Sequence, residues 1–163
     1  MQPEFSYSFL HACKRRGIHT ALETTGYAPR EVMSKLLEVT DLLLYDMKLL
    51  DTELHRQYTG VPNQRILDNL QHLAAAGRDI QIRVPCIPGI NDDAKQIQST
   101  AHFVAGLGIA KMALLPYNPA TAAKYQWLGR SYTLVDRVQQ SAEYMASLAD
   151  ICGKQGLQVQ VGG

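Results

Sequence analysis

The chain has 163 residues, of which 46% are hydrophobic and 19% are charged, a composition typical of one globular domain with a substantial core. A net charge of +1 gives no electrostatic footprint for nucleic acid, and no apolar run is long enough to predict a membrane span. The cysteines Cys13, Cys86 and Cys152 are too far apart for a metal knuckle, and they indicate a reducing compartment, the cytoplasm.

Helical and strand patterns alternate from end to end. Residues 4–16 place Phe5, Phe9 and Ala12 at helical intervals, which predicts a first helix with these side chains on its apolar face. Further helices are expected over 29–39, 51–60, 63–77, 91–108 and 133–156, and strands over 18–25, 41–50, 79–89, 110–118 and 157–163. Asp51, Asn63 and Asn91 are the expected N-caps. This alternation predicts a single α/β domain over residues 1–163, with a parallel sheet and right-handed crossovers.

The second expected strand, within DLLLYDMKLL, is too continuously apolar for a half-exposed strand, and it is typical of a sheet covered on both faces. It nevertheless contains Asp46 and Lys48, two positions apart and therefore on one face. Two charges on such a strand need compensation. A structural ion pair and a ligand site both supply it, and this segment alone leaves the two readings open.

Ligands of parallel α/β folds bind at the carboxyl ends of the strands. Polar side chains occur at that end of four consecutive expected strands: Glu23, Thr24, Thr25, Asp46, Lys48, Arg83, Tyr117 and Asn118. Two carboxylates with two cations suit a zwitterionic or carboxylate-bearing small molecule. No nucleophile with an adjacent base and no phosphate loop accompanies them, so no residue is assigned a catalytic or metal-binding role. The five histidines are expected at surface or boundary positions.

Several stretches together resemble the activating enzymes of glycyl radical enzymes, such as pyruvate formate-lyase activase, within the radical SAM superfamily. They are GIHTALETTGY, DLLLYDMK, HRQYTGVPNQRILDNLQHLAAAG, IRVPCIPGINDD and LLPYN, in the family's order over roughly residues 1 to 133. The resemblance implies a partial (βα)6 barrel of the TIM type. For this chain it implies about five parallel strands with helices outside, truncated at the N-terminus.

The resemblance also implies a chemistry. A [4Fe-4S] cluster reduces S-adenosylmethionine to a 5′-deoxyadenosyl radical, which takes hydrogen from a glycine of the partner enzyme, and flavodoxin or ferredoxin donates the electron. Lys48 would face the methionine carboxylate, with Asp46 and Glu23 nearby and a monovalent cation between them. The cofactor-binding residues implied in this way are Glu23, Thr24, Asp46, Lys48, Arg83 and Asn118.

Two departures from the family pattern matter. Asn118 stands where the family's LPYH has histidine, and asparagine hydrogen-bonds but does not titrate. The cluster motif C-x3-C-x2-C and a Gly-Gly-Glu segment are absent. We therefore expect the C-terminal portion of an activase, inactive alone because the cluster cysteines are missing. Its first strand would be an open edge, which predicts self-association.

Two other readings remain. One is a non-catalytic half-barrel that binds S-adenosylmethionine or a partner, and the upstream reading frame distinguishes it. The other is an unrelated TIM-like lyase or aldolase with Lys48 as a Schiff-base amine, although the neighbouring Asp46 would raise rather than lower the lysine pKa.

Overall fold

The fold is built on one parallel sheet. The computed structural model describes residues 2–134 and 136–162, and its five strands lie in the order β1-β2-β3-β4-β5, each parallel to its neighbours. The strands are β1 (Ala21–Thr24), β2 (Leu42–Asp46), β3 (Ile80–Pro85), β4 (Lys111–Leu115) and β5 (Gln158–Val161). Sequential order with parallel pairing means that every connection is a crossover, which confirms the predicted α/β class.

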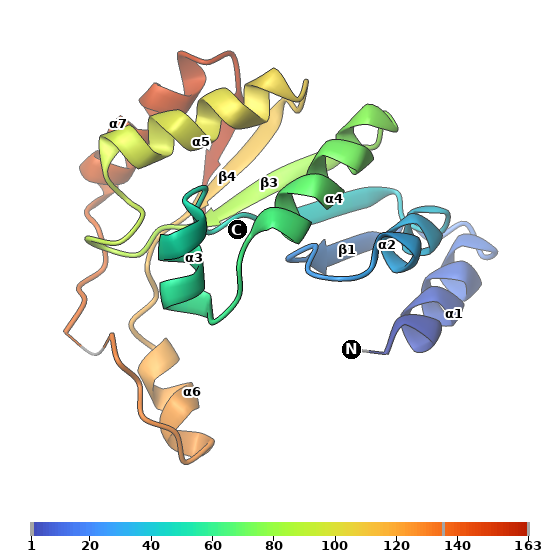
Figure 1. The fold of residues 1–163 in the computed structure, drawn as a ribbon, viewed down its shortest axis with the longest axis horizontal. Coiled ribbons are helices and arrows are strands. Elements are labelled where there is room, and N and C mark those ends of the chain that lie inside the picture. Colours follow the sequence, from blue (N-terminus) through green and yellow to red (C-terminus); the bar gives the residue numbers. More distant parts are fainter. Residues whose placement is uncertain (1, 135, 163) are drawn as a thin grey trace.

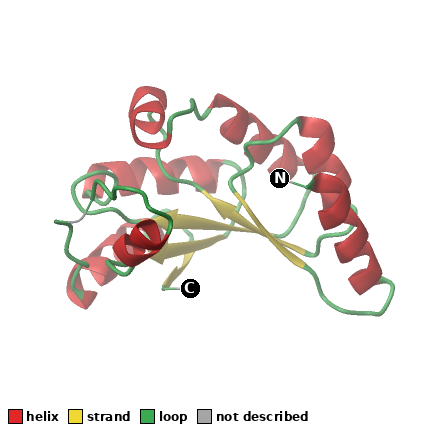
Figure 2. Ribbon diagram, turned by 90° about the horizontal axis from the view of Figure 1, so that it is seen from below, coloured by secondary structure: helices red, strands yellow, loops and turns green. Residues whose placement is uncertain are grey.

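Helices cover one side of this sheet. They are α1 (Pro3–Lys14), α2 (Arg30–Leu37), α3 (Thr52–Thr59), α4 (Gln64–Ala75), α5 (Ala94–Gly106), α6 (Thr121–Trp127) and α7 (Ala142–Gly153) (Figure 1). Seen edge-on, the helices that pack on the sheet lie on one side of it, and within the described residues no helix lies across the other side (Figure 2). The exception is α6, which buries no residue and projects beyond the strand ends (Figure 1). The arrangement is that of an open half-barrel with its helices outside.

Burial along β2 shows the same asymmetry. Leu43 and Tyr45 are at most 1% exposed, whereas Leu42 and Leu44 on the alternate face are only half-buried. The expectation that this strand is covered on both faces is therefore wrong. One apolar face of the strand packs under the helices, and the other apolar face lines the open side of the half-barrel.

The core lies between the sheet and four helices, α2, α4, α5 and α7. Tyr45, Ile82 and Met112 supply the strand side, and each is fully buried. The helix side comes from apolar residues at helical spacing: Met33 and Leu37 of α2, Leu70 and Leu73 of α4, Ile97, Ala101 and Val104 of α5, and Met145, Leu148 and Cys152 of α7. One continuous core of this size holds the strand ends, and thus the polar side chains beyond them, in fixed register.

The α1 helix forms as expected but turns a different face inward. Leu10 packs on Leu36 and Val39, whereas the predicted apolar residues Phe5 and Phe9 are 66% and 58% exposed. The two rings stack on each other with centroids 6.2 Å apart. The helical periodicity predicted where the helix lies, but it did not predict which of its faces packs against the rest of the domain.

The segment after β4 differs most from expectation. The helix α6 forms within a stretch expected to be irregular, and the long helix expected over 133–156 is reduced to α7. Ser141 caps α7 by accepting a hydrogen bond from the Tyr144 N–H. Residues before it bind elsewhere: Gln140 accepts from the Tyr117 N–H at 2.9 Å, so tertiary bonds replace the helical ones. Position 135 of the expected helix lies outside the described residues.

None of the helices, over the residues that the structure describes, combines the length and apolar character needed to cross a membrane.

Candidate functional site

Charged side chains gather on the uncovered face of the sheet, at the carboxyl ends of the first three strands. Asp46 lies beside Arg83 in the register of β2 and β3. The Arg83 guanidinium is 2.5 Å from the Glu23 carboxylate and 3.9 Å from Asp46 Oδ1. The Lys48 ammonium is 3.7 Å from Asp46 Oδ2. The structure thus brings together the two carboxylates and two cations that we singled out in the sequence.

Asp46 is at the centre of this group and is incompletely satisfied. Its Oδ1 is buried and has no hydrogen-bond partner among the described atoms, because Arg83 Nε at 3.9 Å is beyond hydrogen-bond reach. Burial raises the pKa of Asp46, although Lys48 and Arg83 act in the opposite direction. A buried carboxylate oxygen is stable only with a donor or cation beside it. The arrangement therefore has room for one more positive or hydrogen-bonding group.

A cavity of about 200 Å³ opens beside Asp46 and Lys48. Its far wall includes His55, which is only 3% exposed, so the expectation of a surface or boundary position is wrong for this histidine. His55 Nδ1 is 2.8 Å from the Val61 carbonyl, which can only accept, so Nδ1 carries the proton. The hydrogen bond fixes the imidazole next to the charged group. The sequence did not predict the burial of His55, because the spacing of residues along a helix does not show which of them pack against other elements.

The remaining two proposed site residues lie apart from the charged group. Thr24 follows Glu23 on β1 and so faces the opposite side of the sheet, where its hydroxyl accepts from the Gly26 N–H at 3.0 Å. Asn118 is exposed beyond β4, and its Oδ1 accepts from the Ala120 N–H at 3.0 Å. Both side chains shape the turns in which they lie.

Two expected helix caps have a different role. Asp93, not Asn91, caps α5 by accepting from the Gln96 N–H, and Asn63 makes no side-chain cap bond to α4. The side-chain amides of both asparagines instead bind backbone carbonyls at the end of β2. Asp51 does cap α3, as expected.

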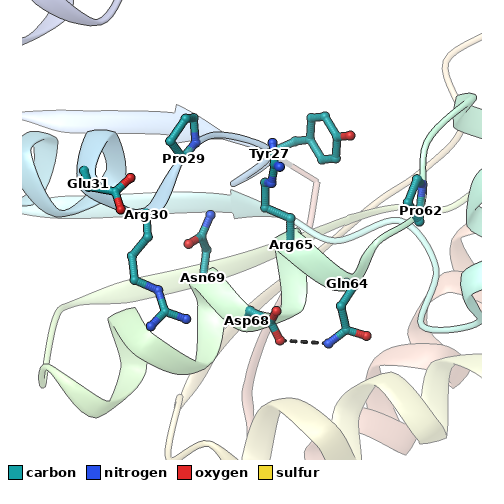
Figure 3. A pocket seen from close by; sticks show the side chains of 9 residues that line it. All are labelled: Tyr27, Pro29, Arg30, Glu31, Pro62, Gln64, Arg65, Asp68 and Asn69. Carbon is teal, nitrogen blue, oxygen red and sulfur yellow. Dashed lines mark hydrogen bonds between the residues drawn. The ribbon is translucent and has the colours of Figure 1, made fainter.

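A larger hollow lies elsewhere, between the loop after β1 and the first turns of α4 (Figure 3). It measures about 560 Å³ and is lined by charged and polar side chains. Arg65 lies over the Tyr27 ring at 5.2 Å, and Gln64 donates to Asp68 at 2.8 Å. With no unsatisfied buried group among the described residues here, this hollow is a weaker ligand site than the group around Asp46.

The described residues do not fit an iron–sulfur cluster. Residues 2–134 and 136–162 contain no group of three histidine, cysteine or acidic side chains placed to hold a metal. Burial raises the pKa of Cys86 to about 12 and that of Cys152 to about 11, which disfavours the thiolate form that a metal requires.

Comparison with known proteins gives a consistent result. No family model matches the chain. It is 36% identical, over 99% of its length, to the (2S)-3-sulfopropanediol dehydratase activating enzyme of Klebsiella oxytoca, of which it covers 53%. It is also 36% identical, over 82% of its length, to the pyruvate formate-lyase 1-activating enzyme of Escherichia coli K12, of which it covers 56%. The chain thus spans about half the length of these curated relatives.

Solved structures agree with this. A crystallised domain of pyruvate-formate lyase-activating enzyme from Bacteroides vulgatus superposes with a TM-score of 0.83 at 32% identity, covering 99% of this chain and 92% of that domain. Streptococcus suis SuiB bound to S-adenosylmethionine shares the fold alone, with a TM-score of 0.65 at 13% identity over 96% of this chain and 34% of its own. The chain therefore belongs to the family of glycyl radical enzyme activating enzymes, with the radical SAM fold.

Proposed function

We propose that the charged group around Asp46 binds S-adenosylmethionine and that the protein serves to activate a glycyl radical enzyme. The observation that carries the proposal is the unsatisfied, buried Asp46 Oδ1 amid Glu23, Lys48 and Arg83 on the open face of the sheet. S-adenosylmethionine carries a carboxylate, an ammonium and a sulfonium. Each of its charged groups therefore meets an opposite charge in this arrangement.

The residues would divide the ligand between them. Lys48 is held only loosely by Asp46, at 3.7 Å, and is free to pair with the methionine carboxylate. Arg83 is held by Glu23 at 2.5 Å and would fix the orientation of the acidic side chains. Asp46 Oδ1 would accept a positive group or a monovalent cation. Asn118 would contribute a hydrogen-bonding amide where the family's motif has histidine. Thr24, whose side chain faces the other side of the sheet, would contribute by shaping the turn after β1.

The remaining chemistry would come from groups that the described residues do not hold. Bound S-adenosylmethionine, when reduced by a [4Fe-4S] cluster, supplies the radical that takes a hydrogen atom from the glycine of a partner enzyme. The part of the chain that the structure describes offers no ligand set for that cluster, so we propose that the 163-residue chain is inactive by itself. A glycyl radical enzyme and an electron donor such as flavodoxin or ferredoxin would be its cytoplasmic partners.

Calorimetric titration with S-adenosylmethionine tests the site. We expect micromolar binding that Lys48→Ala abolishes. Lys111→Ala is the matched control, because Lys111 lies on the same sheet face at the opposite end of a strand, paired with Asp79 at 2.8 Å. Equal binding by wild type and Lys48→Ala would overturn the assignment. Absence of binding by the wild-type chain would show that these residues do not form a sufficient site.

The alternative is a half-barrel that binds S-adenosylmethionine or a partner without redox chemistry. The lack of a metal-ligand group among the described residues is compatible with both readings. The coding sequence upstream of residue 1 distinguishes the two: an in-frame cluster motif supports the activating enzyme, and its absence supports the binding domain.

A further inference from the structure

The main-chain pairing between β2 and β3 ends just before Lys48. The last main-chain bond between β2 and β3 in this region runs from the Met47 N–H to the Arg83 carbonyl, at 2.8 Å. After this bond, Lys48, Leu49 and Leu50 form a loop, and each of these residues is half-buried or buried. Carbonyls in such a place need other donors.

Asn91 supplies one of these donors. It is only 5% exposed, and its Nδ2 donates to the Lys48 carbonyl at 2.7 Å and to the Pro85 carbonyl at 2.9 Å. Its Oδ1 accepts from the Ile87 N–H at 2.6 Å. One side chain thus ties Lys48, two residues beyond β2, to the last residue of β3 and to the loop that follows it.

Asn63 holds the next two carbonyls of the same loop. It is 1% exposed, and its Nδ2 donates to Leu49 at 3.0 Å and to Leu50 at 2.7 Å. Its Oδ1 accepts from the Thr52 hydroxyl at 2.8 Å. Three consecutive carbonyls are therefore held by two buried amides, one on either side of the loop.

We propose that Asn91, supported by Asn63, is a positioning residue that sets the Lys48 ammonium against Asp46. The ion pair does not hold Lys48 by itself, because 3.7 Å is too long for a good hydrogen bond and the lysine side chain is 37% exposed. What fixes the start of this flexible side chain is its own backbone, which Asn91 clamps to β3, the strand that carries Arg83. The role in ligand binding rests on the proposed function, whereas the effect on Lys48 does not.

The test compares Asn91→Ala with Thr40→Ala. Thr40 is similarly buried, at 6% exposed, and its hydroxyl donates to the Leu36 carbonyl at 2.7 Å, at the amino end of β2 away from the site. Both variants lose buried hydrogen bonds to backbone carbonyls. Two quantities are measured in each: the pKa of the Asp46 carboxyl by NMR titration of the ligand-free chain, and the affinity for S-adenosylmethionine. Asn91→Ser, which keeps a donor, replaces Asn91→Ala if the latter does not fold.

Because the nearby Lys48 lowers the pKa of Asp46, releasing Lys48 should raise it. We therefore expect Asn91→Ala to raise that pKa and to weaken ligand affinity roughly tenfold, as loss of a supporting hydrogen-bond shell does elsewhere. Thr40→Ala should change neither quantity. In a Lys48→Ala background, Asn91→Ala should have no further effect on either one.

An unchanged Asp46 pKa in Asn91→Ala would overturn the proposal. So would an equal pKa change with and without Lys48, since the amide would then act on the strand end as a whole. If the wild-type chain does not bind S-adenosylmethionine, the proposed function fails, and the Asp46 titration still decides whether Asn91 positions Lys48.

Discussion

Replacement of Gly26 by alanine should destabilise the fold far more than a typical glycine substitution. Gly26 follows β1 with φ of 72°, a conformation that residues with a Cβ rarely adopt. An added Cβ would lie 1.7 Å from the Tyr45 hydroxyl oxygen and 2.2 Å from Cζ. Tyr45 has no room to retreat, because it is fully buried and its hydroxyl donates to the Ile66 carbonyl at 2.7 Å.

The magnitude follows from three contributions. The left-handed conformation costs about 1–2 kcal/mol for an L-residue. Displacing Tyr45 loses a buried hydrogen bond, worth about 1 kcal/mol. Forcing extra volume into a packed core costs about 1–3 kcal/mol. We therefore expect the free energy of unfolding to fall by about 3–6 kcal/mol in Gly26→Ala, from the sum of these terms.

Gly60→Ala is the matched control. Gly60 also has a positive φ, 82°, but nothing lies within 4 Å of its added Cβ, so only the conformational contribution of about 1–2 kcal/mol applies. Urea unfolding followed by far-UV circular dichroism measures both variants. Adding Tyr45→Phe to Gly26→Ala should restore little, because the ring carbon still blocks the site. Equal losses in Gly26→Ala and Gly60→Ala would refute the steric reasoning.

Four further predictions concern two charged groups, the sheet edge and a helix cap. Burial raises the pKa of Asp46, so the ionised carboxylate destabilises the fold as the pH rises above the ordinary aspartate pKa of about 3.9. Asp46→Asn should therefore raise the urea midpoint at neutral pH but not in acid. The hydrogen bond from Lys14 lowers the pKa of Asp41, so the ionised Asp41 stabilises the fold, and Asp41→Asn should lower the urea midpoint at neutral pH but not in acid. For either aspartate, an unchanged midpoint at neutral pH would contradict the prediction. The open edge of β1 should make the chain self-associate with concentration, and Ala21→Lys should suppress this; a strictly monomeric light-scattering profile at high concentration counts against it. Asp93→Ala should lower stability by about 1 kcal/mol with no change in ligand affinity, and a loss of affinity would mean that α5 capping is coupled to the site.

Local patterns in the sequence were sufficient for the parallel α/β class, the order of its main elements and the charged group at the strand ends. Strand alternation and helical spacing are properties of neighbouring residues, and parallel strands place their carboxyl ends together. These rules alone predict that Asp46, Lys48, Arg83 and Glu23 lie at one edge of the sheet. Their role as a ligand site remains a prediction.

Only the tertiary structure decided which faces are covered and what holds the site in place. Phe5 and Phe9 have the spacing of a buried stripe and yet are exposed, because a helix with two apolar stripes buries the one that meets a neighbour. Asn91 and Asn63 resemble helix caps in the sequence, but their amides bind distant carbonyls instead. Asn91 binds the carbonyl of Lys48, 43 positions away, and Asn63 binds those of Leu49 and Leu50, 14 and 13 positions away. An asparagine side chain binds whichever unsatisfied carbonyl the fold brings within reach, and that proximity is set by packing between elements rather than by the residues beside it.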